Sequence, residues 1–500
     1  MSRIKKNIAA NFGGTLWAGL VSLMFIPIYL HLLGVEAFGL VAIFTTLLAM
    51  FAVLDLGLIQ TLTREMARLA IRPDSAREMR DLLRTLEIPY VGMGLMIGVV
   101  VVLIAPWIAH EWINNQTLST QSVQTAVMLM GLMIAMQWPL GFYSGGLVGL
   151  QEQVVLNLFN GALALGRGVA SALVLWQLAP TIEAFFWTNL VTTIAHVMIV
   201  RRLLWRRLPA DPQPPRFRPD LLRGIWRFAA GVSGIGLISS LLMQLDKIIL
   251  SKLLSLEMFG YYAIANVISM NVYRLFGPIY SAIYPRLTNL VALGFRNELA
   301  VFYHKSAQLL AVAVFPAVAV LVFFSKELLL IWLGNPVTAD AVAPLVSILV
   351  MGTALNGIMH IPYGLQLAAG WTALALRFGV ISVVVFGILL VVLTELYGVV
   401  GAAMAWPIQQ ALYVIFTVPL THRRLLPGEQ WRWYWADVGY PLILALVPVV
   451  LAWYLKPDAL GMTAMLFYLF GTYIASLTLV IMGLPAFRSE VIFQNMRRII

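Results

Sequence analysis

The feature that most constrains this chain is a succession of apolar segments, each about 20 residues long, with few polar residues between them. A helix of about that length crosses a hydrocarbon core about 30 Å thick. Of the 500 residues, 61% are hydrophobic and 11% are charged, whereas a soluble domain carries about 25% charged residues. The chain is therefore expected to be an all-helical integral membrane protein without a large soluble domain.

Charged or Gly/Pro-rich breaks divide the sequence into fourteen predicted spans. They cover residues 8–31, 37–62, 86–109, 122–148, 155–178, 183–204, 228–252, 258–284, 306–333, 341–367, 371–395, 397–420, 436–455 and 460–483. The fold class expected from this pattern is an all-α polytopic membrane protein with about fourteen transmembrane helices.

Lys and Arg are distributed unequally between alternate loops. Positive residues near span ends stay in the cytoplasm. With the N-terminus inside, 27 of the 33 Lys and Arg fall on inside segments, and the outside loops hold only Lys252 and Lys456. Both termini are therefore predicted to be cytoplasmic. This asymmetry explains most of the net charge of +11, which indicates affinity for anionic membrane lipid and not for nucleic acid.

Two short motifs recur at a nearly constant spacing. Glu36-Ala-Phe-Gly39 recurs as Glu257-Met-Phe-Gly260, and Trp112-Ile-Asn-Asn115 recurs as Trp332-Leu-Gly-Asn335. A repeat of six spans predicts two lobes related by an axis along the membrane normal. The Pro- and Arg-rich stretch after span six cannot continue a helix. We therefore expect an N-terminal lobe at 1–204, a cytoplasmic linker at 205–227, a C-terminal lobe at 228–420, and spans 13 and 14 with a cytoplasmic tail at 421–500.

Several chemistries are excluded by what the sequence lacks. It contains no cysteine, no Walker motif and no HExxH zinc motif. The outside loops are too short to carry a catalytic site, and the first offers only Glu36. We expect neither an enzyme nor a metal site, and no cofactor.

A series of motifs resembles the polysaccharide exporters of the multidrug/oligosaccharidyl-lipid/polysaccharide (MOP) superfamily, the Wzx-type flippases. In the first half these are Phe25–Gly39, Leu54–Leu58 and Thr63–Ala67, and in the second half Leu245–Leu254 and Phe259–Ala265. Tyr273–Pro278 and Tyr284–Leu287 are similar to span eight of the related lipid II flippases. The order and spacing of the motifs, more than any one of them, carry the resemblance.

This resemblance implies two six-helix lobes, a central cleft and alternating access. It also implies that an undecaprenyl-pyrophosphate-linked oligosaccharide is moved from the inner to the outer leaflet of the bacterial inner membrane, for O-antigen, capsule or exopolysaccharide synthesis. A polysaccharide polymerase and a chain-length regulator would be the protein partners. A cation-coupled multidrug antiporter of the same superfamily is the alternative, and a membrane glycosyltransferase or polymerase is a less favoured one. The sugar and the driving force, whether Na⁺, H⁺ or membrane potential, stay open.

Ionisable residues within spans are the candidate functional residues, because each costs about 2.5–3.5 kcal/mol at a helix centre. Guanidinium groups match phosphate oxygens bidentately, so cations could bind the pyrophosphate. Arg274 also matches a cavity arginine of the lipid II flippases. The predicted substrate ligands are Arg274, Arg167 and Lys247 for the pyrophosphate, with Gln409, Gln410 and His360 for the sugar. The two glutamines could equally hydrogen-bond between helices.

A second set is predicted to serve in gating or ion coupling: Asp55, Asp246, Arg274 and Arg64. The repeat offset takes Asp55 to position 275, and both Asp55 and Arg274 are expected in the inner halves of spans two and eight. We therefore predict that they form an inter-lobe ion pair in the outward-open state. Asp246 could hold a coupling cation or proton, while Lys247, about 100° around the helix, is expected to snorkel outward.

Overall fold

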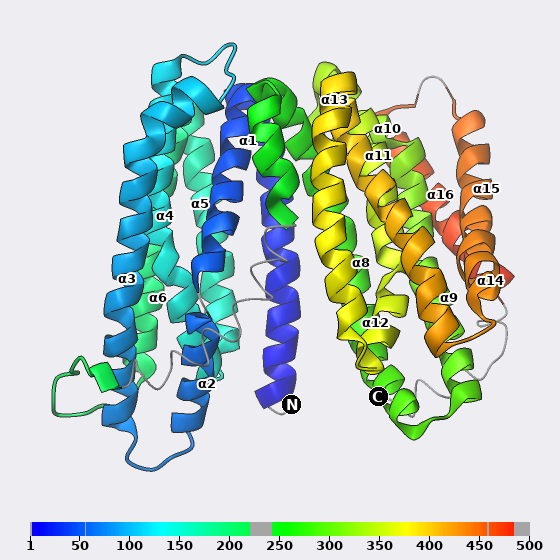
Figure 1. The fold of residues 1–500 in the computed structure, drawn as a ribbon. Helices are drawn as coiled ribbons and strands as arrows, with labels where there is room; N and C mark the ends of the chain where they lie inside the picture. The colour runs from blue at the N-terminus through cyan, green and yellow to red at the C-terminus, as the bar shows by residue number, and fades with distance from the viewer. Residues whose placement is uncertain (1–2, 56, 221–242, 458–459, 485–500) are drawn as a thin grey trace. The chain divides into compact units, whose positions relative to one another are not determined.

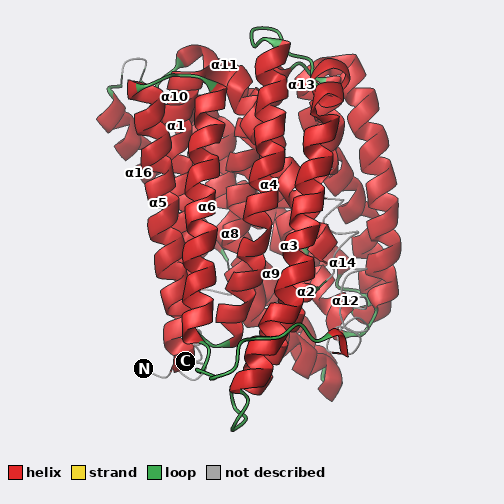
Figure 2. Ribbon diagram, turned by 90° about the vertical axis from the view of Figure 1, so that its left-hand side faces the viewer, coloured by secondary structure: helices red, strands yellow, loops and turns green. Residues whose placement is uncertain are grey.

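The computed structural model describes residues 3–55, 57–220, 243–457 and 460–484, and these are almost entirely helical (Figures 1 and 2). One isolated bridge pairs Asn114 with Ser255. The elements are α1 (Arg3–Ala52), η1 (Val53–Asp55), α2 (Leu58–Leu69), α3 (Ala76–Trp107), η2 (Ile108–Trp112), α4 (Thr120–Gly149), α5 (Gln153–Gln177), α6 (Ile182–Arg207), α8 (Leu256–Leu293), α9 (Arg296–Phe323), α10 (Ser325–Leu333), α11 (Pro336–Ile358), α12 (His360–Ala368), α13 (Thr372–Leu425), α14 (Gln430–Arg432), η3 (Trp433–Gly439), α15 (Tyr440–Tyr454) and α16 (Met462–Gly483).

Within the described ranges, ten helical segments are long and apolar enough to cross a membrane. Two of them, α1 and α13, each cover two predicted spans. Each consists of two helices that join at a kink, at Gly34 (φ 82°) in α1 and at Gly398 (φ 59°) in α13. Only glycine adopts such left-handed conformations at little cost. The predicted all-helical polytopic class is confirmed. Most of the predicted seventh span, 228–252, lies outside the described residues.

The second predicted span ends earlier than residue 62, and this boundary was wrong. Helix α1 stops at Ala52, a short 3₁₀ turn follows, and Gly57 adopts φ 74° before α2 begins. The Asp55 carboxylate accepts a hydrogen bond from the Ile59 backbone N–H at 3.3 Å, which satisfies a donor that a helix start leaves unpaired. Asp55 therefore lies at a helix break and not within a continuous span.

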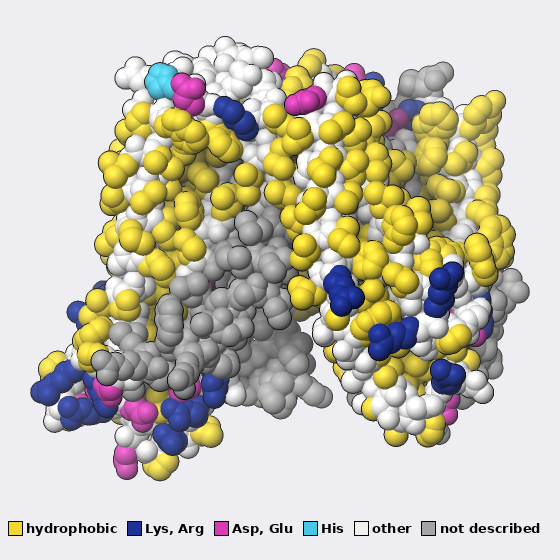
Figure 3. Space-filling view, viewed as in Figure 1, with side chains coloured by type: hydrophobic (Ala, Val, Ile, Leu, Met, Phe, Trp, Pro, Cys, Tyr) yellow, Lys and Arg dark blue, Asp and Glu magenta, His cyan; other side chains and the backbone are white. Residues whose placement is uncertain are grey.

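The chain divides into two compact units, residues 1–260 and 261–500. In the N-terminal unit, α4 packs against α2, α3 and α6, and α1 packs against α5. Lys and Arg side chains gather at one end of this unit, below a hydrophobic belt (Figure 3). Part of the predicted linker lies along α3 and is hydrogen-bonded to it. The Arg216 N–H donates to Asp81 (2.7 Å), and the Arg218 N–H donates to the Thr85 hydroxyl (2.9 Å).

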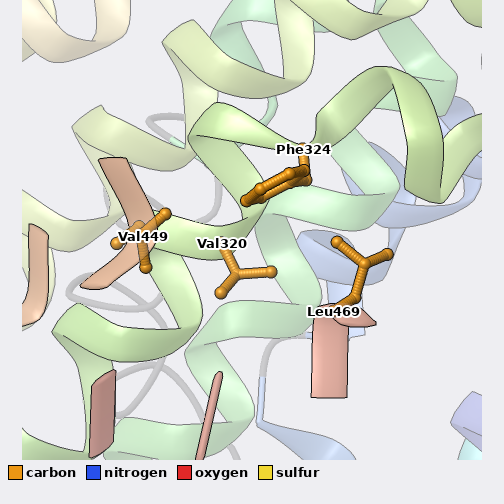
Figure 4. Packing of buried hydrophobic residues seen from close by; sticks show 5 residues of the cluster. Val320, Phe324, Val449 and Leu469 are labelled. Carbon is orange, nitrogen blue, oxygen red and sulfur yellow. The ribbon is translucent and has the colours of Figure 1, made fainter. Parts of the chain in front are cut away.

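The C-terminal unit includes the last predicted pair of spans. Helices α15 and α16 pack against each other and against α9. Val320 and Phe324, at the end of α9, meet Val449 of α15 and Leu469 of α16 in a buried cluster (Figure 4). Because lipid tails are as apolar as these side chains, van der Waals packing between the helices holds the pair in this unit.

The glycine of each Glu-x-Phe-Gly copy contacts the residue that directly precedes the other copy, where α8 begins beside α1 (Figure 1). A Cβ on Gly39 would lie 2.5 Å from the Leu256 carbonyl oxygen, and one on Gly260 would lie 2.5 Å from the Val35 carbonyl oxygen. Only residues without a side chain allow this mutual approach of two backbones. The repeated glycines thus have a packing role that the repeat alone did not reveal.

Candidate functional site

The first candidate cluster surrounds Arg167 in the N-terminal unit. Helix α5 presents Arg167, while Tyr29 of α1 and His196 of α6 lie within electrostatic range of its guanidinium. The Tyr29 hydroxyl donates to the Gly168 carbonyl (3.5 Å), and His196 Nε2 lies 2.9 Å from Asn160 Oδ1. Among the described residues, no carboxylate lies within 4.0 Å of Arg167. The cluster is therefore a partly buried cation among neutral polar groups.

The second candidate cluster lies in the C-terminal unit, where α8, α12 and α13 meet. The His360 ring is 5.4 Å from that of Phe276 and 5.8 Å from that of Tyr280, measured between centroids. Asn356 links this group to α13, because its side-chain amide donates to Gln410 Oε1 at 3.2 Å. The backbone carbonyl oxygen of Asn356 also lies 3.1 Å from His360 Nδ1. Asn356 thus links His360 to Gln410.

Two further members of the predicted substrate set lie on the elements of this second cluster. Arg274 is exposed on α8, three residues from Gly277 and four from Pro278, which are exposed as well. Gln409 is buried, and its Oε1 has no hydrogen-bond partner among the residues described. A buried carbonyl oxygen without a partner is costly, so Gln409 Oε1 is an unsatisfied acceptor on an element of this cluster.

Two of the predicted gating residues, Asp55 and Asp246, have partners within their own unit. Asp55 Oδ1 accepts the Tyr90 hydroxyl at 2.8 Å. Lys247 was expected to snorkel outward, and this was wrong: its ammonium folds back to lie 3.4 Å from the Met243 carbonyl oxygen and 3.3 Å from Asp246 Oδ1. Because Asp246 is only 6% exposed, pairing with the adjacent cation offsets the cost of burying its charge. Arg64 lies on the exposed face of α2.

A family model for a polysaccharide biosynthesis protein matches residues 4–291, which is more than half of the chain. The chain belongs to this family. It is 21% identical over 418 residues, 82% of this chain and 96% of the relative, to a Shigella flexneri protein named "Putative O-antigen transporter". The predicted resemblance to the polysaccharide exporters is confirmed, and the family is one of transporters, not of enzymes.

Solved structures confirm the superfamily fold of this polysaccharide biosynthesis family member. The lipid II flippase MurJ in an inward closed conformation matches with a TM-score of 0.69 at 12% identity, over 95% of this chain and 97% of that one. An inward-facing multidrug resistance MATE transporter of the MOP superfamily matches with a TM-score of 0.65 at 12% identity, over 82% of this chain and 94% of that one. Identity this low shows the fold alone.

Sequence reasoning missed a buried carboxylate in this family member. Glu87 of α3 is 3% exposed and accepts hydrogen bonds from the Tyr143 hydroxyl (2.7 Å), Arg201 Nε (2.7 Å) and Arg84 Nη1 (3.3 Å). Arg84 and Arg201 are among the 27 Lys and Arg that the loop pattern assigns to inside segments, which gives no sign of this pairing. The available signal was an acidic residue two positions before Pro89, at the start of an apolar run. The network joins α3, α4 and α6.

Proposed function

We propose that this protein is a flippase that carries an undecaprenyl-pyrophosphate-linked oligosaccharide from the inner to the outer leaflet of the bacterial inner membrane. The product would pass to a polysaccharide polymerase and its chain-length regulator, and both termini of the flippase would face the cytoplasm. The observation that carries this proposal is Arg167, a cation within a transmembrane helix of a polysaccharide-biosynthesis family member, with no carboxylate partner among the described residues. An anionic pyrophosphate supplies the missing counter-charge.

The composition of α8 supports a hydrophilic path beside it. This helix is 38 residues long, yet it is too polar to be among the ten apolar spans. Its exposed positions within the predicted span include Arg274 and Ser281, which lie on one face of the helix. Because lipid tails cannot satisfy such groups, this face of α8 would line water or substrate.

The extent of the structural match supports a flippase over a multidrug antiporter. The MurJ fold accounts for 95% of this chain, whereas the MATE fold accounts for 82%. Helices α15 and α16 are integral to the C-terminal unit here, and they extend the chain beyond a twelve-span antiporter.

Deletion of the gene in its host tests the function. We expect loss of surface polysaccharide and accumulation of the lipid-linked repeat unit on the cytoplasmic side of the inner membrane, both reversed by the wild-type chain on a plasmid. Surface glycan would be measured by gel electrophoresis and the lipid-linked intermediate by mass spectrometry. Normal surface polysaccharide in a deletion strain without a paralogue would refute the proposal.

The proposed pairing of Asp55 with Arg274 is tested by charge exchange. We expect Asp55→Arg and Arg274→Asp each to reduce complementation by roughly tenfold or more, since like charges would face each other, and the double variant to recover a measurable part. Quantified surface polysaccharide is the readout. Because Tyr90 also holds Asp55, Tyr90→Phe serves as a control that leaves the charge in place. A double variant no better than either single variant would rule out the pair.

A further inference from the structure

A buried histidine in the C-terminal unit lies between two carboxylates that the flippase proposal does not use. His304 of α9 contacts Asp437 Oδ2 through Nδ1, and its Nε2 lies 3.0 Å from Glu429 Oε2. His304 is 2% exposed and Asp437 is fully buried. Glu429 directly precedes α14, and Asp437 lies in the π-helical turn η3, a rare conformation that occurs often at functional sites. Together the three residues connect the beginning of the thirteenth span to α9.

The number of protons in this trio follows from its geometry. A neutral imidazole has one N–H and one lone pair, whereas an ionised carboxylate only accepts hydrogen bonds. Both ring nitrogens face carboxylate oxygens. Both contacts are therefore hydrogen bonds only if the trio holds one proton more than a neutral imidazole and two carboxylates. Without that proton, a ring lone pair would face an anionic oxygen in a buried site, which is unfavourable.

The surrounding groups favour the ionised form of both carboxylates, so that the extra proton resides on the imidazole. Gln308 donates to the other oxygen of Asp437 at 2.9 Å, and Arg432 lies 3.6 Å from Glu429 Oε2. With the extra proton the trio carries one negative charge, which Arg432 balances. The titratable and charged groups that face His304 from the packed elements are Tyr303 and Lys305 of α9, His422 of α13, Glu429 and Arg432 at α14, and Tyr434 and Asp437 of η3.

A hollow of about 380 Å³ next to the trio provides a route for a proton. It is lined by His304, Lys305, Gln308, Arg432 and Trp435, among others. Glu429, at 29% side-chain exposure, is the most accessible member of the trio. A proton can therefore reach the imidazole without passing through the apolar core of the unit.

We propose that His304, Asp437 and Glu429 form a binding site for one exchangeable proton, which fastens the start of the thirteenth span to α9. When the proton leaves, the neutral imidazole keeps one N–H. That N–H stays with Asp437, because leaving a fully buried carboxylate unpaired costs more than releasing a partly exposed one. The contact between His304 and Glu429 then opens, and residues 429–433 are released from α9.

Hydrogen–deuterium exchange of the full-length protein in lipid nanodiscs, from pH 5 to pH 9, tests this site. After correction for intrinsic exchange rates, we expect residues 429–433 to be protected at low pH and to exchange roughly tenfold faster or more at high pH, because a charge-assisted hydrogen bond is lost. Residues 120–124, at the start of α4 with Ser119 as cap, serve as an internal control without pH dependence. Protection of 429–433 that does not change with pH would overturn the proposal.

Conservative variants identify the proton. In Glu429→Gln the new amide donates to a neutral imidazole, so both ring contacts are satisfied without an extra proton. We therefore expect protection that no longer depends on pH, and the same for Asp437→Asn should the first variant be unstable. A pH dependence in Glu429→Gln equal to that of the wild type would contradict the assignment. Protection that rises with Na⁺ at constant pH would show that the site binds a metal cation instead.

Discussion

Replacing Arg167 by Gln is expected to reduce complementation of surface polysaccharide by at least roughly a hundredfold, while Arg167→Lys retains part of it. The guanidinium can bind two phosphate oxygens at once, whereas an ammonium acts as a single point charge and a neutral amide removes the charge altogether. Tyr29 and His196 remain near the position, so the polar surroundings persist without the cation. Lipid-linked intermediates would accumulate in parallel.

Thermal unfolding of purified Arg167→Gln separates function from stability. Because no carboxylate pairs with Arg167 among the described residues, removing its charge from a transmembrane helix should leave the melting temperature unchanged or raise it. Lys326→Gln is the matched control: Lys326 is half-exposed and pairs with Asp340 at 2.6 Å, so its loss should alter neither transport nor stability much. Full complementation by Arg167→Gln would contradict the proposed role.

Adding one methyl group at Gly39 or at Gly260 is expected to destabilise the protein by about 1–3 kcal/mol, as overpacking typically does. The new Cβ atoms would lie 2.5 Å from the carbonyl oxygens of Leu256 and Val35, so α1 and the start of α8 must move apart. The free energy of unfolding would be measured by chemical denaturation in detergent. The double variant should lower the free energy of unfolding by less than the sum of the two single effects, because both positions lie at the same contact between α1 and α8.

Gly92→Ala is the control for this pair of substitutions. Gly92 lies in the interior of α3, and a Cβ there would meet no atom within 4 Å. The same change should therefore stabilise the helix by about 0.5–1 kcal/mol. We therefore predict that the free energy of unfolding falls in Gly39→Ala and Gly260→Ala and rises in Gly92→Ala. Equal effects of Gly39→Ala and Gly92→Ala would show that the close approach of the two motifs does not restrict these positions.

Helices and their breaks were predictable because they depend on local sequence. Apolar runs located the spans; the break at Gly34 falls between the first two predicted spans, and the break at Gly398 falls at the start of the twelfth. The end of the second span was missed because the residues after Ala52 are still apolar. A left-handed Gly57 and a carboxylate that accepts the Ile59 N–H end the helix there, and neither changes the hydropathy of the run.

Charge partners were not predictable, since they join residues far apart in the chain. Glu87 and Arg201 are separated by 114 positions, and His304 and Asp437 by 133. Neither His304 nor Asp437 was singled out from the sequence, although an aspartate within an apolar run was a signal. The pairing of Asp246 with Lys247 was missed for another reason: adjacent side chains diverge at the backbone, but a long lysine can fold back.

The amino-acid sequence alone determined that this chain is a polytopic membrane protein of a polysaccharide exporter family, because burial in lipid requires long apolar helices and the family motifs keep their order along the chain. Only the tertiary structure decided what the motif and the charges do. Gly39 and Gly260 are small because each meets the backbone of the residue that directly precedes the other copy. Helix packing gave the buried carboxylates of Glu87 and Asp437 hydrogen-bond donors, whereas it gave Arg167 no carboxylate partner among the described residues. Whether a charge is paired depends on which helices pack together, and hydropathy does not encode that.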